Sequence, residues 1–241
     1  MIRADKLLLF DIDGTLVDTE GAGLIALEAG FFNAFPFCRE SSFPSLDLGG
    51  ATDSSVVAFL FDHFAIENHA GHRDLFFDEY LLALDRCMRE FRRRGKGRSL
   101  PGVPEFLKRL EKREDCLLGI LTGNVEAGAR LKLKHFDIDG YFGFGAFGTD
   151  HKTRNGLGPI AIDRAEVAAG KRFDPSRAII IGDTLKDIAC ARAFDARVIA
   201  VATGGVSEEI LGSGNPDILL PNFADTAAAI EAIDSLFASD Q

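Results

Sequence analysis

Two aspartates, Asp11 and Asp13, lie two residues apart directly after an apolar run. Side chains two residues apart on an extended segment leave the same face, so both carboxylates point in one direction. Carboxylates this close repel each other unless a cation lies between them or one of them stays protonated. Since an acid catalyst requires a protonated carboxyl, the pair indicates a metal site, an acid–base site or both.

A second acidic motif, Asp183 with Asp187 four residues later, follows another apolar run. Carboxylate oxygens without His or Cys ligands select Mg²⁺ rather than zinc. We therefore predict a Mg²⁺ site with the ligands Asp11, Asp13, Asp183 and Asp187. In it, Asp11 is expected to attack, Asp13 to move the proton and Asp183 to hold the metal.

A third motif, Thr122, Gly123 and Asn124, ends another apolar run. Its hydroxyl and successive backbone N–H groups are the donors that a tetrahedral oxyanion such as phosphate needs. We predict that these three residues bind phosphate, with a nearby cation completing the site.

Lys152 and Arg154 are the candidates for this cation, in a loop that precedes a helix expected to begin near Pro159. A guanidinium can hold two phosphate oxygens at once, whereas a lysine acts as a point charge. At this stage both residues remain candidates.

One continuously apolar segment, residues 7–10, and three similar runs, residues 116–121, 178–181 and 197–202, end at these motifs or at a further Thr-Gly-Gly segment. Such runs are typical of strands buried on both faces, and helix-like stretches separate several of them. Strands that alternate with helices predict an α/β fold with a parallel sheet. Because functional groups gather at the carboxyl ends of parallel strands, we expect the polar motifs to converge.

The pattern of apolar residues changes between residue 18 and about residue 94, where the runs typical of buried strands are replaced by helix-like segments rich in phenylalanine. We interpret this part as a helical insertion with its own core, to which its phenylalanines, Phe31, Phe32, Phe35, Phe59, Phe61, Phe64, Phe76 and Phe77 among them, are expected to belong. A Gly- and Pro-containing stretch from Phe91 to Gly102 is expected to be the return linker.

Composition excludes several classes of protein. The 241 residues, 46% hydrophobic and 27% charged, fit a folded protein of one or two domains. A formal charge of −10 argues against broad binding of nucleic-acid phosphates. No apolar run approaches the roughly 20 residues of a membrane helix and no signal-peptide pattern occurs, so we expect a cytoplasmic protein without a membrane partner.

In chain order, Asp11-Ile-Asp-Gly-Thr-Leu, Leu121-Thr-Gly-Asn and Ile181-Gly-Asp-Thr-Leu-Lys-Asp187 resemble the motifs of the haloacid dehalogenase superfamily. More narrowly, the chain resembles the phosphoglycolate-phosphatase-like hydrolases over nearly its whole length. The resemblance implies a Rossmann-like core of residues 1–17 and 98–241, and an α-helical cap domain inserted at 18–97. It also implies one Mg²⁺ and hydrolysis of a small phosphorylated metabolite through an aspartyl-phosphate.

Matched by position, Asp11 corresponds to the family's nucleophile, Asp13 to its general acid/base and Thr122 to its phosphate-binding hydroxyl. Asp183 and Asp187 correspond to the acidic motif around the metal. The family's usual Lys-Pro pair is absent, and we predict that Arg154 replaces the lysine, with Lys152 as the alternative.

Other functions compatible with the family remain alternatives. Asp13 argues against carbon–halogen hydrolysis, because a halide leaves without needing a proton. A phosphomutase would have to protect its phospho-aspartate from water, and no feature of the sequence establishes this. A non-catalytic protein that only binds a phosphate ligand would be expected to lack one of the aspartates. No prediction of the oligomeric state follows from the sequence.

Three further patterns favour structural interpretations. Asp137-Ile-Asp-Gly140 repeats the first motif but follows an amphipathic helix, which predicts a helix-to-strand turn. Gly143 to Gly148 spells GxGxxG without a helix at its third glycine, so we expect a Gly-rich strand and loop rather than a dinucleotide site. The arginines between Arg86 and Arg94 are expected to form a solvated face.

Overall fold

The core of the fold is a sheet built on strand β1 (Lys6–Phe10). The computed structural model describes residues 4–238, and within them six parallel strands follow the order β5-β4-β1-β6-β7-β8. The other five strands are β4 (Cys116–Leu121), β5 (Gly145–Ala146), β6 (Ala178–Gly182), β7 (Arg197–Val201) and β8 (Ile218–Leu220). The predicted α/β parallel-sheet core is therefore confirmed.

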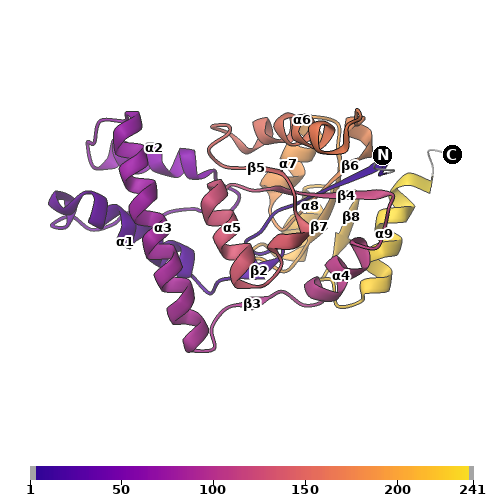
Figure 1. Cartoon of the computed structure of the whole chain (residues 1–241), viewed down its shortest axis with the longest axis horizontal. Coiled ribbons are helices and arrows are strands. Elements are labelled where there is room, and N and C mark those ends of the chain that lie inside the picture. The colour runs from indigo at the N-terminus through magenta and orange to yellow at the C-terminus, as the bar shows by residue number, and fades with distance from the viewer. Residues whose placement is uncertain (1–3, 239–241) are drawn as a thin grey trace.

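Helices cover both faces of this sheet, as Figure 1 shows. Leu8 and Phe10 of β1 face one core cluster, and Leu7 and Leu9 face the other, which explains why the strand is apolar at every position. The first cluster includes side chains of α4 (Val103–Leu110), α5 (Glu126–His135) and α9 (Thr226–Ala238). The second includes those of α6 (Leu157–Ala169), α7 (Leu185–Ala193) and α8 (Glu208–Ser213).

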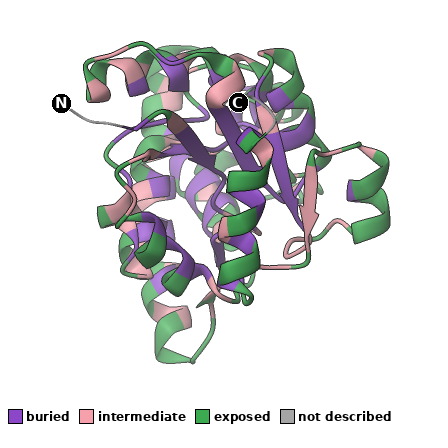
Figure 2. Ribbon diagram, turned by 90° about the vertical axis from the view of Figure 1, so that its right-hand side faces the viewer, coloured by how far each residue is buried: buried purple, intermediate pink, exposed green. Residues whose placement is uncertain are grey.

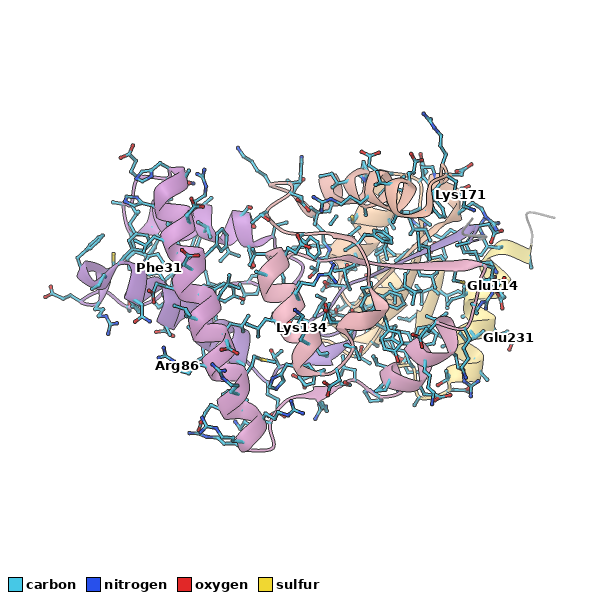
Figure 3. The ribbon with its side chains drawn as sticks, in the orientation of Figure 1. Phe31, Arg86, Glu114, Lys134, Lys171 and Glu231 are labelled. Atoms are coloured by element: carbon cyan, nitrogen blue, oxygen red, sulfur yellow. The ribbon has the colours of Figure 1, made fainter. Side chains whose placement is uncertain are left out.

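The insertion contains the helices α1 (Ala22–Ala34), α2 (Asp53–His63) and α3 (Ala70–Arg93), gathered at one end of the molecule (Figure 1). They enclose a separate core in which Phe31 contacts five other phenylalanine rings at centroid distances of 4.7–6.2 Å. Figure 3 shows Phe31 among these helices. The phenylalanines thus form a core as predicted, except that Phe59 is 49% exposed.

Two connections join the insertion to the core. They pair as short antiparallel strands, β2 (Val17–Asp18) and β3 (Arg98–Ser99). Because each of these two strands is only two residues long, the sequence pattern did not indicate them. They lie where the predicted boundaries of 18 and 97 fall, although the boundaries themselves stay predictions.

Several expected elements begin or end elsewhere than predicted. Helix α6 begins at Leu157, two residues before Pro159, because proline is tolerated in the first turn of a helix. Helix α3 continues to Arg93, into the stretch expected to be linker from Phe91 onward. Strand β8 was not predicted, because its apolar run is only three residues long and lies between Asp217 and Pro221.

The patterns interpreted as structural behave accordingly. Helix α5 ends at His135, and Asp137 at φ 58° leads into the 3₁₀ turn Asp139–Tyr141, so the repeated motif is a helix-end turn. Residues 145–146 form β5, and no helix begins at Gly148. Two further 3₁₀ turns in the core are Arg154–Gly156 and Pro175–Arg177, and one in the insertion is Pro36–Cys38.

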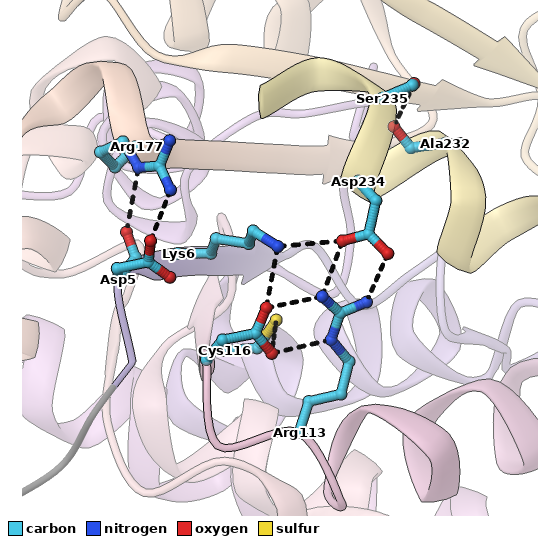
Figure 4. A network of polar contacts seen from close by, with 9 residues as sticks. Asp5, Lys6, Arg113, Cys116, Arg177, Ala232, Asp234 and Ser235 are labelled. Atoms are coloured by element: carbon cyan, nitrogen blue, oxygen red, sulfur yellow. Dashed lines mark hydrogen bonds and ion pairs between the residues drawn. The ribbon is translucent and has the colours of Figure 1, made fainter. Parts of the chain in front are cut away.

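An ion-pair network closes the end of the sheet where β1 and β4 begin (Figure 4). Lys6 donates to Asp115 at 2.8 Å and to Asp234 of α9 at 2.9 Å, and Arg113 donates to the same two carboxylates. The Arg113 guanidinium is the main reason that the pKa of Asp115 lies below its usual range. The network joins three segments far apart in the chain.

Figure 2 shows the buried strands between exposed outer helix faces.

No helix in the described part of the chain is long and apolar enough to cross a membrane.

Candidate active site

A cavity of about 270 Å³ lies between the carboxyl ends of the strands and the insertion. Strand register brings its floor together, because Phe10 pairs with Ile120 of β4 and with Ile181 of β6. The residues that follow these three strands therefore meet, as predicted. The predicted site residues that line the cavity are Asp11, Asp13, Thr122, Gly123, Asn124, Arg154 and Asp183; Asp187 lies behind it.

Three buried carboxylates, those of Asp11, Asp183 and Asp187, each place an oxygen within 4.8 Å of the others. Asp183 is held by a hydrogen bond from the Thr15 hydroxyl at 2.8 Å. Asp187 closes the capping box of α7, accepting from Thr184 N at 3.0 Å and Thr184 Oγ1 at 2.6 Å. The capping box of α7 thus holds Asp187 in place, and the Thr15 hydroxyl holds Asp183.

Burial raises the pKa of Asp183 and of Asp11, and the neighbouring carboxylates raise both further. Carboxylates that are this costly to ionise together are stabilised by a cation between them. The set offers only hard oxygen donors, which suits Mg²⁺ and not zinc. The residues present therefore fit a divalent metal.

Arg154 is buried behind these carboxylates. Its guanidinium lies 3.0 Å from Asp11 Oδ2, donates to Asp187 Oδ1 and reaches the Leu121 carbonyl at 3.3 Å. Its Nε is buried and has no hydrogen-bond partner within residues 4–238. The Lys152 side chain is exposed, and its carbonyl accepts from Thr52 Oγ1 at 2.9 Å. Of the two candidate cations, Arg154 is therefore the one beside Asp11; its contact with phosphate stays a prediction.

The Thr122-Gly123-Asn124 segment forms one side of the cavity. The Thr122 hydroxyl is fully buried and accepts from Asn124 Nδ2 at 2.8 Å. A Cβ on Gly123 would lie 1.8 Å from the Ala51 carbonyl oxygen, so only glycine fits beneath the insertion at this position. The phosphate-binding roles of these residues stay predictions.

Asp13 is not part of the three-carboxylate group. Its Oδ2 accepts from Lys132 Nζ at 2.6 Å and from Asn124 Nδ2 at 2.8 Å, and Lys132 also donates to Asn124 Oδ1 at 2.7 Å. Lys132 was not predicted from the sequence. A signal exists, since it shares the buried face of α5 with Ala129 and Leu133, where a lysine is rarely placed without a partner.

Comparison with known proteins decides the family. The sequence profile of the haloacid dehalogenase-like hydrolases matches residues 8–201. The chain belongs to this family.

This hydrolase is 26% identical over 232 residues to the pyrophosphatase PpaX of Bacillus pumilus, covering 93% of this chain and 96% of that one. It is 24% identical over 234 residues to the phosphoglycolate phosphatase of Photorhabdus laumondii, covering 95% and 94%. A hydrolase from Pseudomonas syringae has a similar fold, with a TM-score of 0.68 at 18% identity and coverage of 94% and 98%. The predicted family, fold and hydrolase class are thereby confirmed.

The insertion contributes one acidic side chain to the hydrolase's cavity, Asp53, for which the sequence leaves a helix cap and a substrate contact as alternatives. It begins α2, whose N-cap is Thr52. Its Oδ2 accepts from Val125 N at 2.6 Å, and its own N–H donates to the Gly123 carbonyl at 2.7 Å. Burial raises the pKa of Asp53 to about 6. These bonds join the insertion to the segment of residues 122–124.

Proposed function

We propose that this hydrolase is a Mg²⁺-dependent phosphatase that cleaves a small phosphomonoester through an aspartyl-phosphate on Asp11. The observation that carries the proposal is the placement of Asp11 and Asp13 in one small cavity, Asp11 against a buried arginine and Asp13 against a buried lysine. The names of the two curated relatives support phosphate-ester or phosphoanhydride chemistry.

Arg154, Thr122 and the backbone N–H groups of the 122–124 segment would orient the phosphate toward Asp11. Asp11 would then attack phosphorus through a carboxylate oxygen while the bond from phosphorus to the leaving oxygen breaks. The metal, when bound by Asp11, Asp183 and Asp187, supplies positive charge that offsets repulsion between carboxylate and phosphate. Metal ligation by Asp13, also predicted from the sequence, would compete with its contacts to Lys132 and Asn124.

Asp13 would give its proton to the departing alkoxide and later take one from the water that hydrolyses the acyl-phosphate. That second attack releases inorganic phosphate and returns Asp11 as a carboxylate. General acid–base help of this kind contributes about 10²- to 10⁴-fold. Lys132 and Asn124 would keep the Asp13 carboxylate in place for both proton transfers.

Residues 18–97 would form the cap domain that excludes water from the cavity. Its separate phenylalanine core, its two short paired connections and its closure by Asp53 support this role.

Phosphate release from a panel of small phosphomonoesters tests the proposal, with Mg²⁺ or with chelator. Asp11→Asn removes the nucleophile with almost no change in volume and is expected to abolish release. Asp137→Asn is the matched control, because it alters the same motif in its second, exposed copy. Equal turnover by Asp11→Asn and the parent would refute the assignment of Asp11 as nucleophile, whereas no release by the parent from any substrate would favour a protein that only binds phosphate ligands.

A further inference from the structure

The wall that the insertion contributes to the cavity has a distinctive chemistry. In the described part of the chain, Asp53 is its only charged side chain. Leu24, Leu27, Leu48 and Val56 give it an apolar surface, and Tyr80 adds a hydroxyl. The leaving group of a bound phosphomonoester would face this wall, since the phosphate is expected on the core side.

The cations that line the cavity are already engaged. Lys132 is bonded to Asp13 and Asn124, and Arg154 lies between Asp11 and Asp187. Lys186 of α7 lies beside the insertion, with its ammonium 3.9 Å from Asp47 Oδ2, and does not line the cavity. Neither of the two cations that line the cavity is therefore free to pair with a second anionic group of a substrate.

The arginines near the end of α3 do not supply such a cation either. Arg89 pairs with Asp85, and Arg93 and Arg94 pair with Glu90, all on the exposed surface of the helix. Figure 3 places Arg86 on α3, and none of these side chains lines the cavity. Exposed pairs of this kind solvate a helix rather than bind a ligand.

Asp53 is fixed in place. One of its oxygens accepts from Val125 N, and its N–H donates to Gly123, so the side chain cannot turn away without breaking the closed arrangement. Its second oxygen, Oδ1, has no hydrogen-bond partner among residues 4–238 and can accept from a ligand. Tyr80 lines the same wall, and its ring is stacked on that of Phe76 at a centroid distance of 6.0 Å.

From this arrangement we infer that the leaving group is a small, uncharged, hydroxylated alcohol, and that leaving groups with a carboxylate or a second phosphate are disfavoured. The inference rests on the proposed phosphatase function and narrows its substrate class. A hydroxyl can donate to Asp53, whereas an anion there meets a like charge and no free cation. The preferred substrate would thus differ from phosphoglycolate and pyrophosphate, which give the two curated relatives their names.

A matched pair of substrates tests the inference. 2-Hydroxyethyl phosphate and 2-phosphoglycolate differ only in a hydroxymethyl group against a carboxylate, and ethyl phosphate serves as the neutral reference without a hydroxyl. We expect kcat/KM for hydroxyethyl phosphate to exceed that for phosphoglycolate by about tenfold or more. That factor corresponds to two like charges roughly 6 Å apart at an effective dielectric constant of about 40.

Asp53→Asn keeps the size of the side chain and an acceptor for Val125 N but removes the charge. It is expected to raise kcat/KM for phosphoglycolate relative to hydroxyethyl phosphate by about tenfold. Asp47→Asn, a carboxylate of the same insertion outside the cavity, is the control and should leave the ratio unchanged.

The outcomes separate the two claims. If both substrates are hydrolysed and phosphoglycolate is preferred, or if Asp53→Asn leaves the ratio unchanged, the substrate inference is wrong and the phosphatase function stands. If neither these substrates nor an activated aryl phosphate releases phosphate with Mg²⁺ present, the proposed function is wrong, and the inference that depends on it is rejected too.

Discussion

Replacing Lys132 by methionine is expected to slow turnover sharply while leaving the protein folded. Methionine matches the lysine chain in length but cannot donate to Asp13 or Asn124, the two groups that the ammonium contacts at 2.6 and 2.7 Å. Asp13 would then keep only its bond from Asn124 and be oriented less firmly toward the leaving oxygen. The variant tests whether a residue that was not predicted from the sequence positions the general acid.

The size of the effect follows from the geometry. A hydrogen bond between charged groups contributes about 1.5–3 kcal/mol, and each 1.4 kcal/mol is a factor of ten in rate. The Asp13 side chain is 41% exposed to the cavity, which screens the pair and favours the lower half of that range. We therefore expect kcat to fall by about 10- to 50-fold. The free energy of unfolding should fall by less than the activation free energy rises, because Asp13 keeps its bond from Asn124.

The assay compares an alkyl phosphate with an aryl phosphate, whose leaving group needs little protonation. If Lys132 positions Asp13, Lys132→Met should affect alkyl phosphates more than aryl phosphates, and Lys132→Arg should recover part of the loss. A purely structural role would slow both substrates equally and lower the melting temperature. A folded Lys132→Met variant with kcat within about twofold of the parent on the alkyl phosphate would refute the reasoning.

Three further changes have definite expected results. Arg154→Ala should lower kcat by about 10²-fold or more and stability by about 3 kcal/mol, since it leaves two buried acids unpaired, whereas Lys152→Ala should change neither; the reverse result would show that Lys152 is the functional cation. Burial raises the pKa of Asp183 to about 8, so the stability that its protonated carboxyl contributes is present below about pH 4 and lost as pH rises to about 8. The melting temperature of the metal-free protein should therefore fall over this range, and Mg²⁺ should restore it most at the alkaline end. Asp183→Asn should weaken both effects. Gly102→Ala would place a Cβ 1.9 Å from the Phe223 carbonyl oxygen at φ 82° and should destabilise the fold by about 3 kcal/mol or more in urea unfolding, against about 1 kcal/mol for Gly95→Ala, which shares a positive φ but meets no atom within 4 Å.

The strands with the strongest sequence signal are those buried on both faces. Strands β1, β4, β6 and β7 were predicted, because a strand covered by helices on either side must be apolar at nearly every position. Strand β8 lies at the edge of the sheet, and its apolar run of three residues is too short to predict a strand. The connections β2 and β3 are too short to show any period.

The amino-acid sequence by itself determined the fold class, the family and the motifs that meet at the carboxyl ends of the strands, because each depends on residues close together in the chain. Only the tertiary structure decided which groups surround them. Lys132 reaches Asp13 from 119 residues away, and Asp53 reaches Val125 from 72 residues away. Such contacts depend on how α5 and the insertion pack on the sheet, and no local pattern of residue types encodes that packing.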